Sequence, residues 1–279
     1  MQSAISANHI NAFMCMELNH AVGREIEKIS EVAGYLWQRE WAERNAGNIS
    51  LNLTGLLEVK NNDIAGRKYI KCSMPAEVAG LVIFVSGTGE RLRDLIKTPE
   101  KAACIIAVDS KAEGYRIIWG GEGRPDIKPT SEFVTHLAIH RFNHQSGNNH
   151  RCIVHTHPAE LIALSHHSVF GHNQDALNKA LWSMLPEISL FVPKGICLVP
   201  YALPGSKALA DYTVEGLKKH SVILWAKHGA LATGADAHEA FDYLDVANKG
   251  AKIYLKCLQA GFYPEGMSDE EMEGLKTLL

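Results

Sequence analysis

The sequence predicts an α/β fold with one domain, a three-layer sandwich in which a mostly antiparallel central sheet has helices on both faces. Segments with helical apolar periodicity alternate with short apolar runs that end at turn residues. Neighbouring strands such as 103–108 and 115–119 are joined by few residues, which favours hairpins over a purely parallel sheet. No repeat or long linker divides the chain, so we expect one domain over residues 1–279, with 1–24 as an N-terminal extension.

The first half of the chain is predicted to begin with a helix over residues 24–43. Its apolar stripe comprises Ile29, Val32, Ala33, Leu36, Trp37 and Trp41. The helix should end at the turn-forming stretch 44–48. Strands are expected at 49–53, 81–85, 103–108 and 115–119, with a short helix at 92–96 after the break at 86–89.

The second half is predicted to arrange its elements around a strand that ends near residue 157. Helices are expected at 131–144, 158–166, 173–184, 206–219 and 236–260, followed by a short acidic helix. Further strands are expected at 188–192, 196–199, 222–225 and 230–232.

Composition and charge exclude several classes of function. The net charge of −3 and a pI near 6.5 give no basic footprint for nucleic acid. No apolar run reaches the roughly 18 residues that a membrane span needs. Polar residues between positions 8 and 20 interrupt any signal-peptide core, and the six cysteines are scattered without a Cys-x-x-Cys pair. We therefore expect a cytoplasmic protein whose reduced thiols pack as small apolar groups.

The segment Cys152-Ile-Val-His155-Thr-His157 carries the most informative pattern. Alternate residues of a strand point to one face, so His155 and His157 project together, about 6.6 Å apart at a rise of ~3.3 Å per residue. Imidazoles so placed can share one metal ion, although a solvent-facing strand end explains the pair equally well. His228 follows another apolar run, and Gly229 after it also suits an ordinary turn. Both positions lie at predicted strand ends, and together they favour a metal site.

Glu132 lies at the start of the predicted helix 131–144, in the segment Pro129-Thr-Ser-Glu132. Thr130 suits the N-cap, and the helix dipole favours a carboxylate in the first turn, so Glu132 needs no function to explain it. Alternatively, three imidazoles and this carboxylate would make a zinc site that holds three ligands firmly and can release the fourth. Thr130 and Ser131 would also offer hydroxyl and N–H groups to an anion at a helix N-terminus.

Weaker signals come from two loops and one helix. Asn45-Ala-Gly-Asn48 and Ser86-Gly-Thr-Gly89 are either plain turns or loops whose small residues bring backbone amides close to a phosphate. Sequence alone does not show that these loops meet. His136, His140 and His144 share one helical face without a carboxylate or cysteine partner at matching spacing, so we expect them to be solvated or to pack.

Five segments taken together resemble the class II (zinc) sugar-phosphate aldolases. They are Asn45-Ala-Gly-Asn48, Ser86-Gly-Thr-Gly89, Pro129-Thr-Ser-Glu132, His155-Thr-His157 and Lys227-His228-Gly229. This superfamily also holds fuculose-phosphate aldolases, ribulose-phosphate 4-epimerases and the adducin head domain. Four more segments resemble the branch that cleaves L-rhamnulose 1-phosphate: Trp41-Ala-Glu-Arg-Asn45, Tyr115-Arg-Ile-Ile-Trp-Gly120, Leu181-Trp-Ser-Met-Leu-Pro-Glu187 and Leu203-Pro-Gly-Ser206. The likeness covers roughly residues 25 to 266.

The resemblance implies a role for each matching residue. It implies one zinc ion per subunit on His155, His157 and His228. It makes Glu132 the catalytic glutamate, which ligates the resting metal and swings away as an acid/base, and Glu187 a second carboxylate from a neighbouring subunit of a fourfold homotetramer. The substrate phosphate would be held by Asn45, Asn48, Ser86, Gly87, Thr130 and Ser131. Ala46 stands where relatives often have glycine, and its methyl group would crowd the pocket slightly.

The implied reaction is the reversible cleavage of L-rhamnulose 1-phosphate to dihydroxyacetone phosphate and L-lactaldehyde. Zinc would act as a Lewis acid on the carbanion equivalent, and carboxylates would manage the protons. The same site could instead serve L-fuculose 1-phosphate or the 4-epimerisation of a pentulose phosphate. A non-catalytic domain like the adducin head is a further alternative, but such a domain need not keep the three histidines and the glutamate that are present here.

Overall fold

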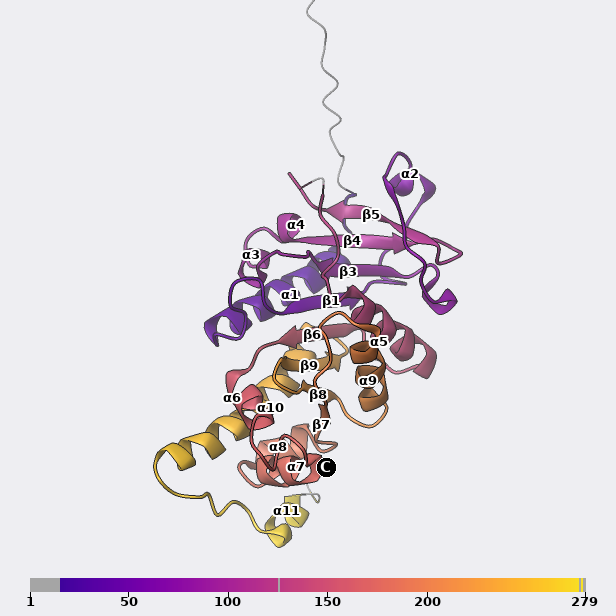
Figure 1. Ribbon diagram of the computed structural model, residues 1–279. Helices are drawn as coiled ribbons and strands as arrows, with labels where there is room; N and C mark the ends of the chain where they lie inside the picture. Colours follow the sequence, from indigo (N-terminus) through magenta and orange to yellow (C-terminus); the bar gives the residue numbers. More distant parts are fainter. Residues whose placement is uncertain (1–15, 125, 276, 278–279) are drawn as a thin grey trace, which may run out of the picture.

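Short apolar segments form one mixed sheet in the computed structural model, which describes residues 16–124, 126–275 and 277. Across these residues the sheet has nine strands in the order β2-β5-β4-β3-β1-β6-β9-β8-β7 (Figure 1). The strands are β1 Asn48–Asn52, β2 Tyr69–Lys71, β3 Val82–Ser86, β4 Ala103–Val108, β5 Gly114–Gly120, β6 Cys152–Thr156, β7 Ile196–Val199, β8 Val222–Trp225 and β9 Gly229–Gly234. All neighbouring pairs are antiparallel except β7 and β8, which confirms the predicted mostly antiparallel sheet.

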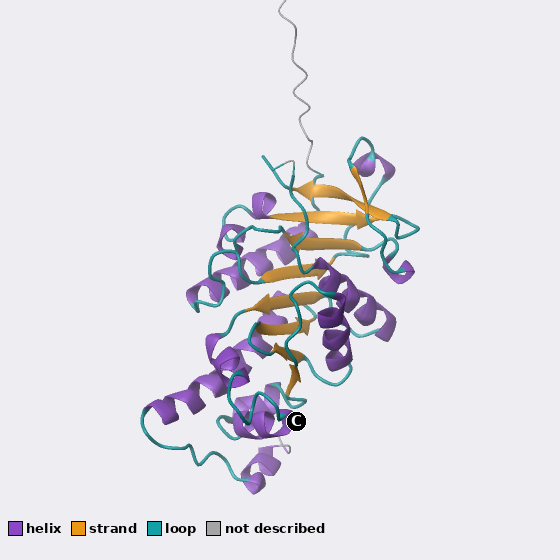
Figure 2. Cartoon of the chain, in the orientation of Figure 1, coloured by secondary structure: helices purple, strands orange, loops and turns teal. Residues whose placement is uncertain are grey.

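Helices cover both faces of this sheet (Figure 2). They are α1 His20–Gln38, α2 Asn61–Ile64, α3 Leu92–Leu95, α4 Pro99–Ala102, α5 Phe133–Ser146, α6 Ala159–Ser165, α7 Gln174–Trp182, α8 Pro186–Phe191, α9 Lys207–Leu217, α10 Ala237–Gln259 and α11 Asp269–Leu275, with a 3-10 turn η1 at Ala76–Val78. Helices α5 and α9 pack together on one face, and α1, α3 and α10 lie on the other. The predicted three-layer sandwich is confirmed.

Alternate side chains of the central strands point to opposite faces of the sheet and pack into the hydrophobic core on each face. In β6, Val154 packs into the core on the α1 and α10 face, whereas Ile153 packs against Ile139 of α5 and Leu209 of α9. Both β6 side chains are fully buried, and each such burial stabilises the fold by about 1.5–3 kcal/mol. Because His155 follows Ile153 by two residues, it faces the α5 side. The period of the strand therefore decides on which face the histidines meet.

The first helix begins and ends earlier than predicted. Helix α1 begins at His20, where the Asn19 side chain accepts a hydrogen bond from the Val22 N–H, and its last residue is Gln38. Glu40 then takes a positive φ of 62°, which ends the helix. Trp41 lies beyond it and is buried, so it does not share the helical stripe. The prediction for Trp37 is also wrong, because its ring is 41% exposed and stacks under the Arg93 guanidinium.

Two other predictions need correction or supplement. The predicted strand at 188–192 is wrong, because Pro186–Phe191 forms the short helix α8. Proline at its first position fixes a helical φ, and the Val192 N–H donates to the Ile188 carbonyl oxygen at 2.9 Å, the i to i−4 bond of an α-helix. The edge strand β2 was not expected, because its residues are largely exposed and form no apolar run. The remaining predicted helices and strands are present, most within two residues of their predicted ends.

The cysteines match the expected pattern in part. Cys104 and Cys152 are buried, and burial raises the pKa of the Cys104 thiol to about 12. Cys72 is exposed, whereas Cys15 and most of the predicted N-terminal extension lie outside the described residues. Among the helices that the structure describes, none is long and apolar enough to cross a membrane.

Candidate metal centre

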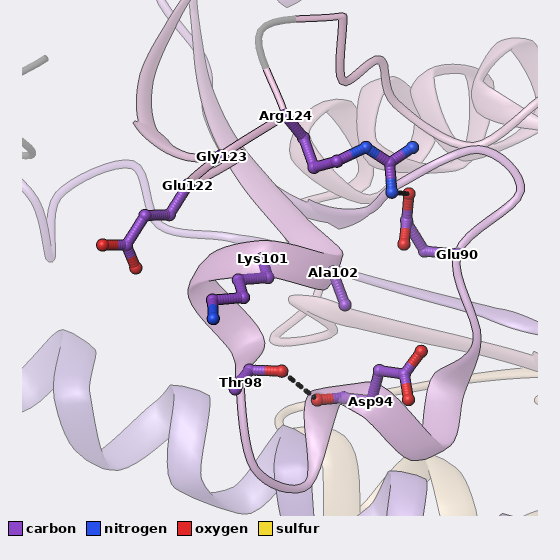
Figure 3. A pocket seen from close by; sticks show the side chains of 8 residues that line it. All are labelled: Glu90, Asp94, Thr98, Lys101, Ala102, Glu122, Gly123 and Arg124. Atoms are coloured by element: carbon purple, nitrogen blue, oxygen red, sulfur yellow. Dashed lines mark hydrogen bonds and ion pairs between the residues drawn. The ribbon is translucent and has the colours of Figure 1, made fainter.

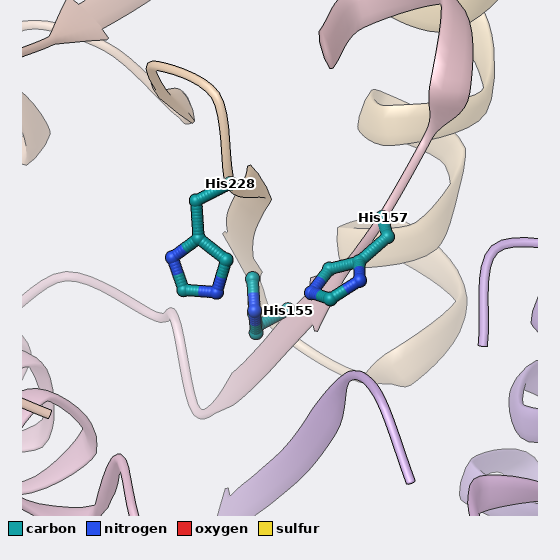
Figure 4. A group of neighbouring side chains, drawn as sticks. All are labelled: His155, His157 and His228. Atoms are coloured by element: carbon teal, nitrogen blue, oxygen red, sulfur yellow. The ribbon is translucent and has the colours of Figure 1, made fainter. Parts of the chain in front are cut away.

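Three histidines from two neighbouring parts of the sheet meet at one end of β6 and β9. His155 lies in β6 opposite Leu231, His157 follows the end of the same strand, and His228 lies in the turn between β8 and β9. One ring nitrogen from each histidine lies within 4.8 Å of the other two (Figure 4). The structure thus brings together the three imidazoles that the sequence singled out, in an arrangement that could bind a metal ion.

Gly229 allows β9 to pass close to these rings. A Cβ atom at this position would lie 2.6 Å from the Thr156 carbonyl oxygen and 2.8 Å from carbon atoms of both the His155 and His157 rings. The preceding Lys227 has a positive φ of 63°, and its N–H donates to the Ser165 hydroxyl at 2.8 Å. The tight turn at Lys227-His228-Gly229 can lie against the histidines because glycine has no Cβ atom to meet their rings.

The tautomers of two histidines are set by partners on their Nδ1 atoms. His155 Nδ1 donates to the Ala230 carbonyl oxygen at 3.0 Å, and His157 Nδ1 donates to a Glu43 carboxylate oxygen at 2.8 Å. In the neutral form of each ring, Nε2 then carries no proton and is available as a ligand. Burial, together with the neighbouring His157 and His228, holds the pKa of His155 well below its ordinary value. Burial also lowers the pKa of His228, so these two rings are neutral, as metal ligation requires.

Glu132 lies beside two of the three rings, those of His155 and His228. It is 5% exposed, and its two carboxylate oxygens lie 3.5 Å from His155 Nε2 and 3.6 Å from His228 Nε2. The Asn48 amide donates to the same carboxylate at 2.8 Å. Three imidazoles and one carboxylate form a donor set that suits zinc. Of the described residues, none hydrogen-bonds the buried His228 Nδ1 atom.

The predicted cap of α5 is wrong. The N-cap residue is Glu132 itself, with φ −92° and ψ 15°, and not Thr130. Thr130 lies two residues earlier, where its backbone N–H donates to the Ser86 carbonyl oxygen and its own carbonyl accepts from Phe133. Glu132 is therefore held at the helix start by the backbone on both sides, and its side chain is left to face the histidines.

Trp225 packs against the rings of His155 and His228, and sequence reasoning missed this role. Its indole ring lies 4.4 Å from the His155 ring and 5.1 Å from the His228 ring, measured between centroids. The indole N–H donates to the Thr213 hydroxyl of α9 at 2.9 Å, which fixes the ring. Its position at the end of the apolar run before His228 could have predicted this role, because a side chain on the same face as the histidines is expected there.

The predicted phosphate residues of two segments also lie side by side. Gly87 pairs with Pro129 in an isolated bridge, which joins the end of β3 to the start of α5. Ser86 and Thr130 are buried there, whereas Ser131 is exposed. The Ser86 hydroxyl oxygen accepts from the Ile49 N–H at 3.1 Å, and its own O–H remains able to donate to a ligand. Their role in binding phosphate stays a prediction.

The loop before β1 lies against the histidine strand. Gly47 has a φ of 75°, and a Cβ atom there would lie 2.8 Å from the His155 carbonyl oxygen, so this position needs glycine. Ala46 is half-buried next to it, with its N–H donating to Glu43. Asn45 is exposed, whereas the amide of Asn48 is buried and directed at Glu132. The loop thus brings Asn48 to the candidate centre and leaves Asn45 at the surface.

Glu187 lies elsewhere in the subunit. It is exposed in the first turn of α8, near the β7 edge of the sheet (Figure 1). Within the described residues, no hydrogen bond or ion pair joins it to Glu132 or to the three histidines. This single chain therefore does not bring Glu187 into the centre, and its catalytic role stays a prediction that depends on a second subunit.

The three histidines of α5 have different surroundings. His144 is exposed, but His136 and His140 are fully buried, as a packing role would require. The Nε2 atom of His136 lies 2.5 Å from the Asn48 side-chain oxygen, so this ring contacts the candidate centre. Sequence reasoning missed that contact because it depends on the register of α5 against β1.

A hollow of about 390 Å³ lies between α3, α4 and the segment after β5 (Figure 3). It is lined by Glu90, Asp94, Thr98, Lys101, Ala102, Glu122, Gly123 and Arg124. Arg124 forms an ion pair with Glu90 at 2.7 Å. None of the predicted site residues lines this hollow, so it is separate from the candidate metal centre.

Known proteins show what this chain is similar to. The family model for the class II aldolase and adducin N-terminal domain matches residues 27–255. A rhamnulose-1-phosphate aldolase from Bacteroides thetaiotaomicron is 39% identical over 265 residues, which cover 94% of this chain and 96% of the relative. A rhamnulose-1-phosphate aldolase from Pectobacterium atrosepticum is 33% identical over 245 residues, or 86% and 88% of the two chains.

Solved structures agree with this relationship. A sugar-phosphate aldolase from Thermotoga maritima superposes with a TM-score of 0.73 at 31% identity, covering 88% of this chain and all of the other. An L-fuculose 1-phosphate aldolase superposes with a TM-score of 0.59 at 18% identity over 96% and 98% of the chains, which shows the same fold. The chain therefore belongs to the family of class II aldolases and adducin N-terminal domains.

Proposed function

We propose that this protein is a zinc-dependent aldolase that reversibly cleaves L-rhamnulose 1-phosphate to dihydroxyacetone phosphate and L-lactaldehyde. The observation that carries the proposal is the convergence of His155, His157 and His228 beside the buried Glu132 carboxylate. The relatives named rhamnulose-1-phosphate aldolase, at up to 39% identity over most of the chain, support this choice of sugar.

The three histidines would hold the metal through ring nitrogens, and burial lowers the pKa of His155 and of His228. A divalent cation bound there would supply Lewis-acid stabilisation of the negative charge left on the three-carbon fragment, worth several kcal/mol. Zinc suits the donor set, since imidazole nitrogen and carboxylate oxygen are among its usual ligands. His155 and His157 already have fixed Nδ1 partners, so little reorganisation would accompany binding.

The remaining work falls to the polar residues of this chain. Glu132 would move a proton to or from C3 of the substrate, because its carboxylate oxygens lie within 3.6 Å of the Nε2 atoms of His155 and His228. The amides and hydroxyls near the end of β3 and the start of α5 would hold the phosphate, so that remote binding energy orients the reacting carbons. The proposed phosphate residues are Asn45, Asn48, Ser86, Gly87, Thr130 and Ser131.

Cleavage of L-rhamnulose 1-phosphate by the purified protein tests the proposal. We expect cleavage to stop when a chelator removes the metal and to return with added zinc. Glu132→Gln keeps the shape of the side chain but cannot exchange protons, so kcat should fall by about 10²- to 10⁴-fold. L-fuculose 1-phosphate and a pentulose phosphate are the comparison substrates. Unchanged turnover after metal removal, or faster turnover of either comparison sugar, would refute the mechanism or the choice of substrate.

We also propose that Glu187 acts in the site of a neighbouring subunit within a homotetramer. In support, exposed apolar side chains lie on α8 and beyond β7: Phe191 is 58% exposed, Tyr201 62% and Leu203 69%. Patches of this kind mark interaction surfaces. Co-expressing Glu132→Gln with Glu187→Gln tests this, because mixed tetramers would contain some sites with both native carboxylates. Recovered activity in the mixture supports the shared site, and its absence, with both variants assembled, refutes it.

A further inference from the structure

A buried ladder of polar side chains leads away from Glu132 between β1 and α5. Its members alternate between helix and strand: Glu132, Asn48, His136, Ser50 and His140, each at most 6% exposed. On the strand, Asn48 and Ser50 are two residues apart, about 6.6 Å at ~3.3 Å per residue. On the helix, the three members are four residues apart, about 6 Å at ~1.5 Å per residue. Because these spacings nearly match, each side chain on the strand can hydrogen-bond to two side chains of the helix segment.

The direction of each hydrogen bond follows from the carboxylate. An ionised carboxylate only accepts, so Asn48 must direct its NH₂ group at Glu132, at 2.8 Å. The Asn48 oxygen then accepts from His136 Nε2–H at 2.5 Å. A neutral His136 with its proton on Nε2 must accept at Nδ1, here from the Ser50 hydroxyl at 2.7 Å.

The far end of the ladder is consistent with this direction. The Ser50 oxygen accepts from His140 Nε2–H at 2.8 Å, which leaves His140 Nδ1 without a proton. No described residue hydrogen-bonds that Nδ1 atom, as expected for the last acceptor of the ladder. Burial lowers the pKa of both His136 and His140 to about 3, so each ring carries a single proton at neutral pH. One arrangement of protons therefore satisfies the four bonds.

We infer that Asn48 is a positioning residue for the Glu132 carboxylate, and that His136, Ser50 and His140 set the orientation of its amide. If the His136 proton moved to Nδ1, the Asn48 amide would turn over and present its oxygen to the carboxylate. Two acceptors would then face each other in a buried site, which is costly. The inference rests on the proposed function, because it gives Asn48 a task in placing the proposed acid/base that is separate from phosphate binding.

Ser50→Ala tests the ladder at a residue that does not touch Glu132. We expect kcat for ketose 1-phosphate cleavage to fall about tenfold, with KM changed less than about twofold and zinc content unchanged. Thr135→Val is the matched control, since Thr135 is a fully buried α5 residue whose hydroxyl has no partner among the described residues. It should stay within about twofold of the parent enzyme. Equal kcat in Ser50→Ala and the control would overturn the inference.

A second measurement needs neither a variant's activity nor the metal. ¹⁵N-histidine NMR of the metal-free protein reports the tautomer of each ring, with His136→Gln and His140→Gln used for assignment. We expect both rings to be neutral with the proton on Nε2. A His136 ring with its proton on Nδ1, or a charged ring, would overturn the ladder even if cleavage is observed. Failure of wild-type cleavage with the expected tautomers would instead count against the proposed function alone.

Discussion

Single residues decide how closely the histidines can approach one another. Gly229 is the clearest case, because the space where a Cβ would lie is already filled by a carbonyl oxygen and two imidazole rings. Glu43 acts from the other side, by holding the Nδ1 atom of His157. Neither residue is a proposed ligand, but both determine whether the three rings keep their positions without reorganisation.

Gly229→Ala should weaken metal binding and destabilise the protein by about 1–3 kcal/mol, because the added methyl group must push back Thr156 or the rings. Gly23→Ala in α1 is the control, since no atom beyond the neighbouring residues and backbone of its own helix lies within 4 Å of its added Cβ. That helical substitution should be neutral or stabilising by about 0.5–1 kcal/mol. Denaturant unfolding and zinc titration measure both effects. Equal behaviour of the two variants would contradict the crowding argument.

Glu43→Gln should lower zinc affinity by about tenfold, at the small end of the range for such partners because Glu43 is 64% exposed. The amide can still accept from His157, but the negative charge that favours the Nδ1 proton is lost. Competition with a coloured chelator measures the affinity. Glu31→Gln is the control, because Glu31 makes a similarly exposed pair with His238 at 2.9 Å. The idea is wrong if both substitutions change affinity equally.

At the scale of elements, periodicity predicted most of what the structure contains. Strands β3, β4 and β5 and helices α9 and α10 were recognisable because their apolar residues repeat at the period of a buried face. The sequence pattern predicts a strand where helix α8 lies, because a segment of six residues is too short to separate the two periods. The end of α1 depended on the positive φ of Glu40, and no residue type at that position announces it.

For the candidate site, the sequence predicts the residues that carry recognisable chemistry but not the contacts that depend on packing between elements. The histidines and Glu132 carry recognisable chemistry, and the resemblance to a family grouped them. Trp225, the Glu43 partner and the His136 contact were missed because each depends on how one element packs on another. Register between α5 and β1 brings His136 to Asn48, and a one-residue shift of the strand would remove that contact. The location of Glu187 relative to the site depends on a second subunit, which one chain's pattern does not contain.

The packing of α5 on β1 also makes stability depend on pH. His140 has a pKa of about 3 in the folded protein against 6.5 in the unfolded chain. The unfolded state therefore binds more protons between these values. The contribution of His140 to the free energy of unfolding is complete above pH 6.5 and is lost as the pH falls toward 3. The slope is up to about 1.4 kcal/mol per pH unit for this one group.

Denaturant unfolding of the metal-free protein at pH 7.5 and 5.5 checks this expectation. The difference in unfolding free energy between the two conditions should shrink in His140→Gln. It should be kept in His144→Gln, a substitution at an exposed position of the same helix. If both variants keep the full difference, burial of His140 is not what links folding to pH.

At the scale of the whole molecule, the candidate centre joins the β6 strand to the turn between β8 and β9 and to the start of α5. A metal ion bound there would hold segments more than 90 residues apart in the sequence, from Glu132 to His228. Binding should therefore stabilise the whole domain, by about 2.7 kcal/mol when free zinc is a hundred times its Kd.

Thermal unfolding with and without zinc measures that effect. The Tm should rise with zinc concentration in the parent protein and stay constant in His155→Ala, which removes one proposed ligand. Lys207→Ala, at an exposed position of α9, is a suitable control and should respond as the parent does. A Tm that ignores zinc in the parent protein would mean that the histidines do not bind it.

The indole of Trp225 gives the protein a built-in optical reporter. With its ring 4.4 Å from that of His155 and shielded from solvent, its emission should respond to whatever the histidines bind. Cobalt(II) or copper(II) would quench that emission strongly, whereas zinc, with a filled d shell, would change it only slightly. Titration followed by fluorescence, with Trp225→Phe as the reference for the signal of the other four tryptophans, would then count occupied subunits without any substrate present.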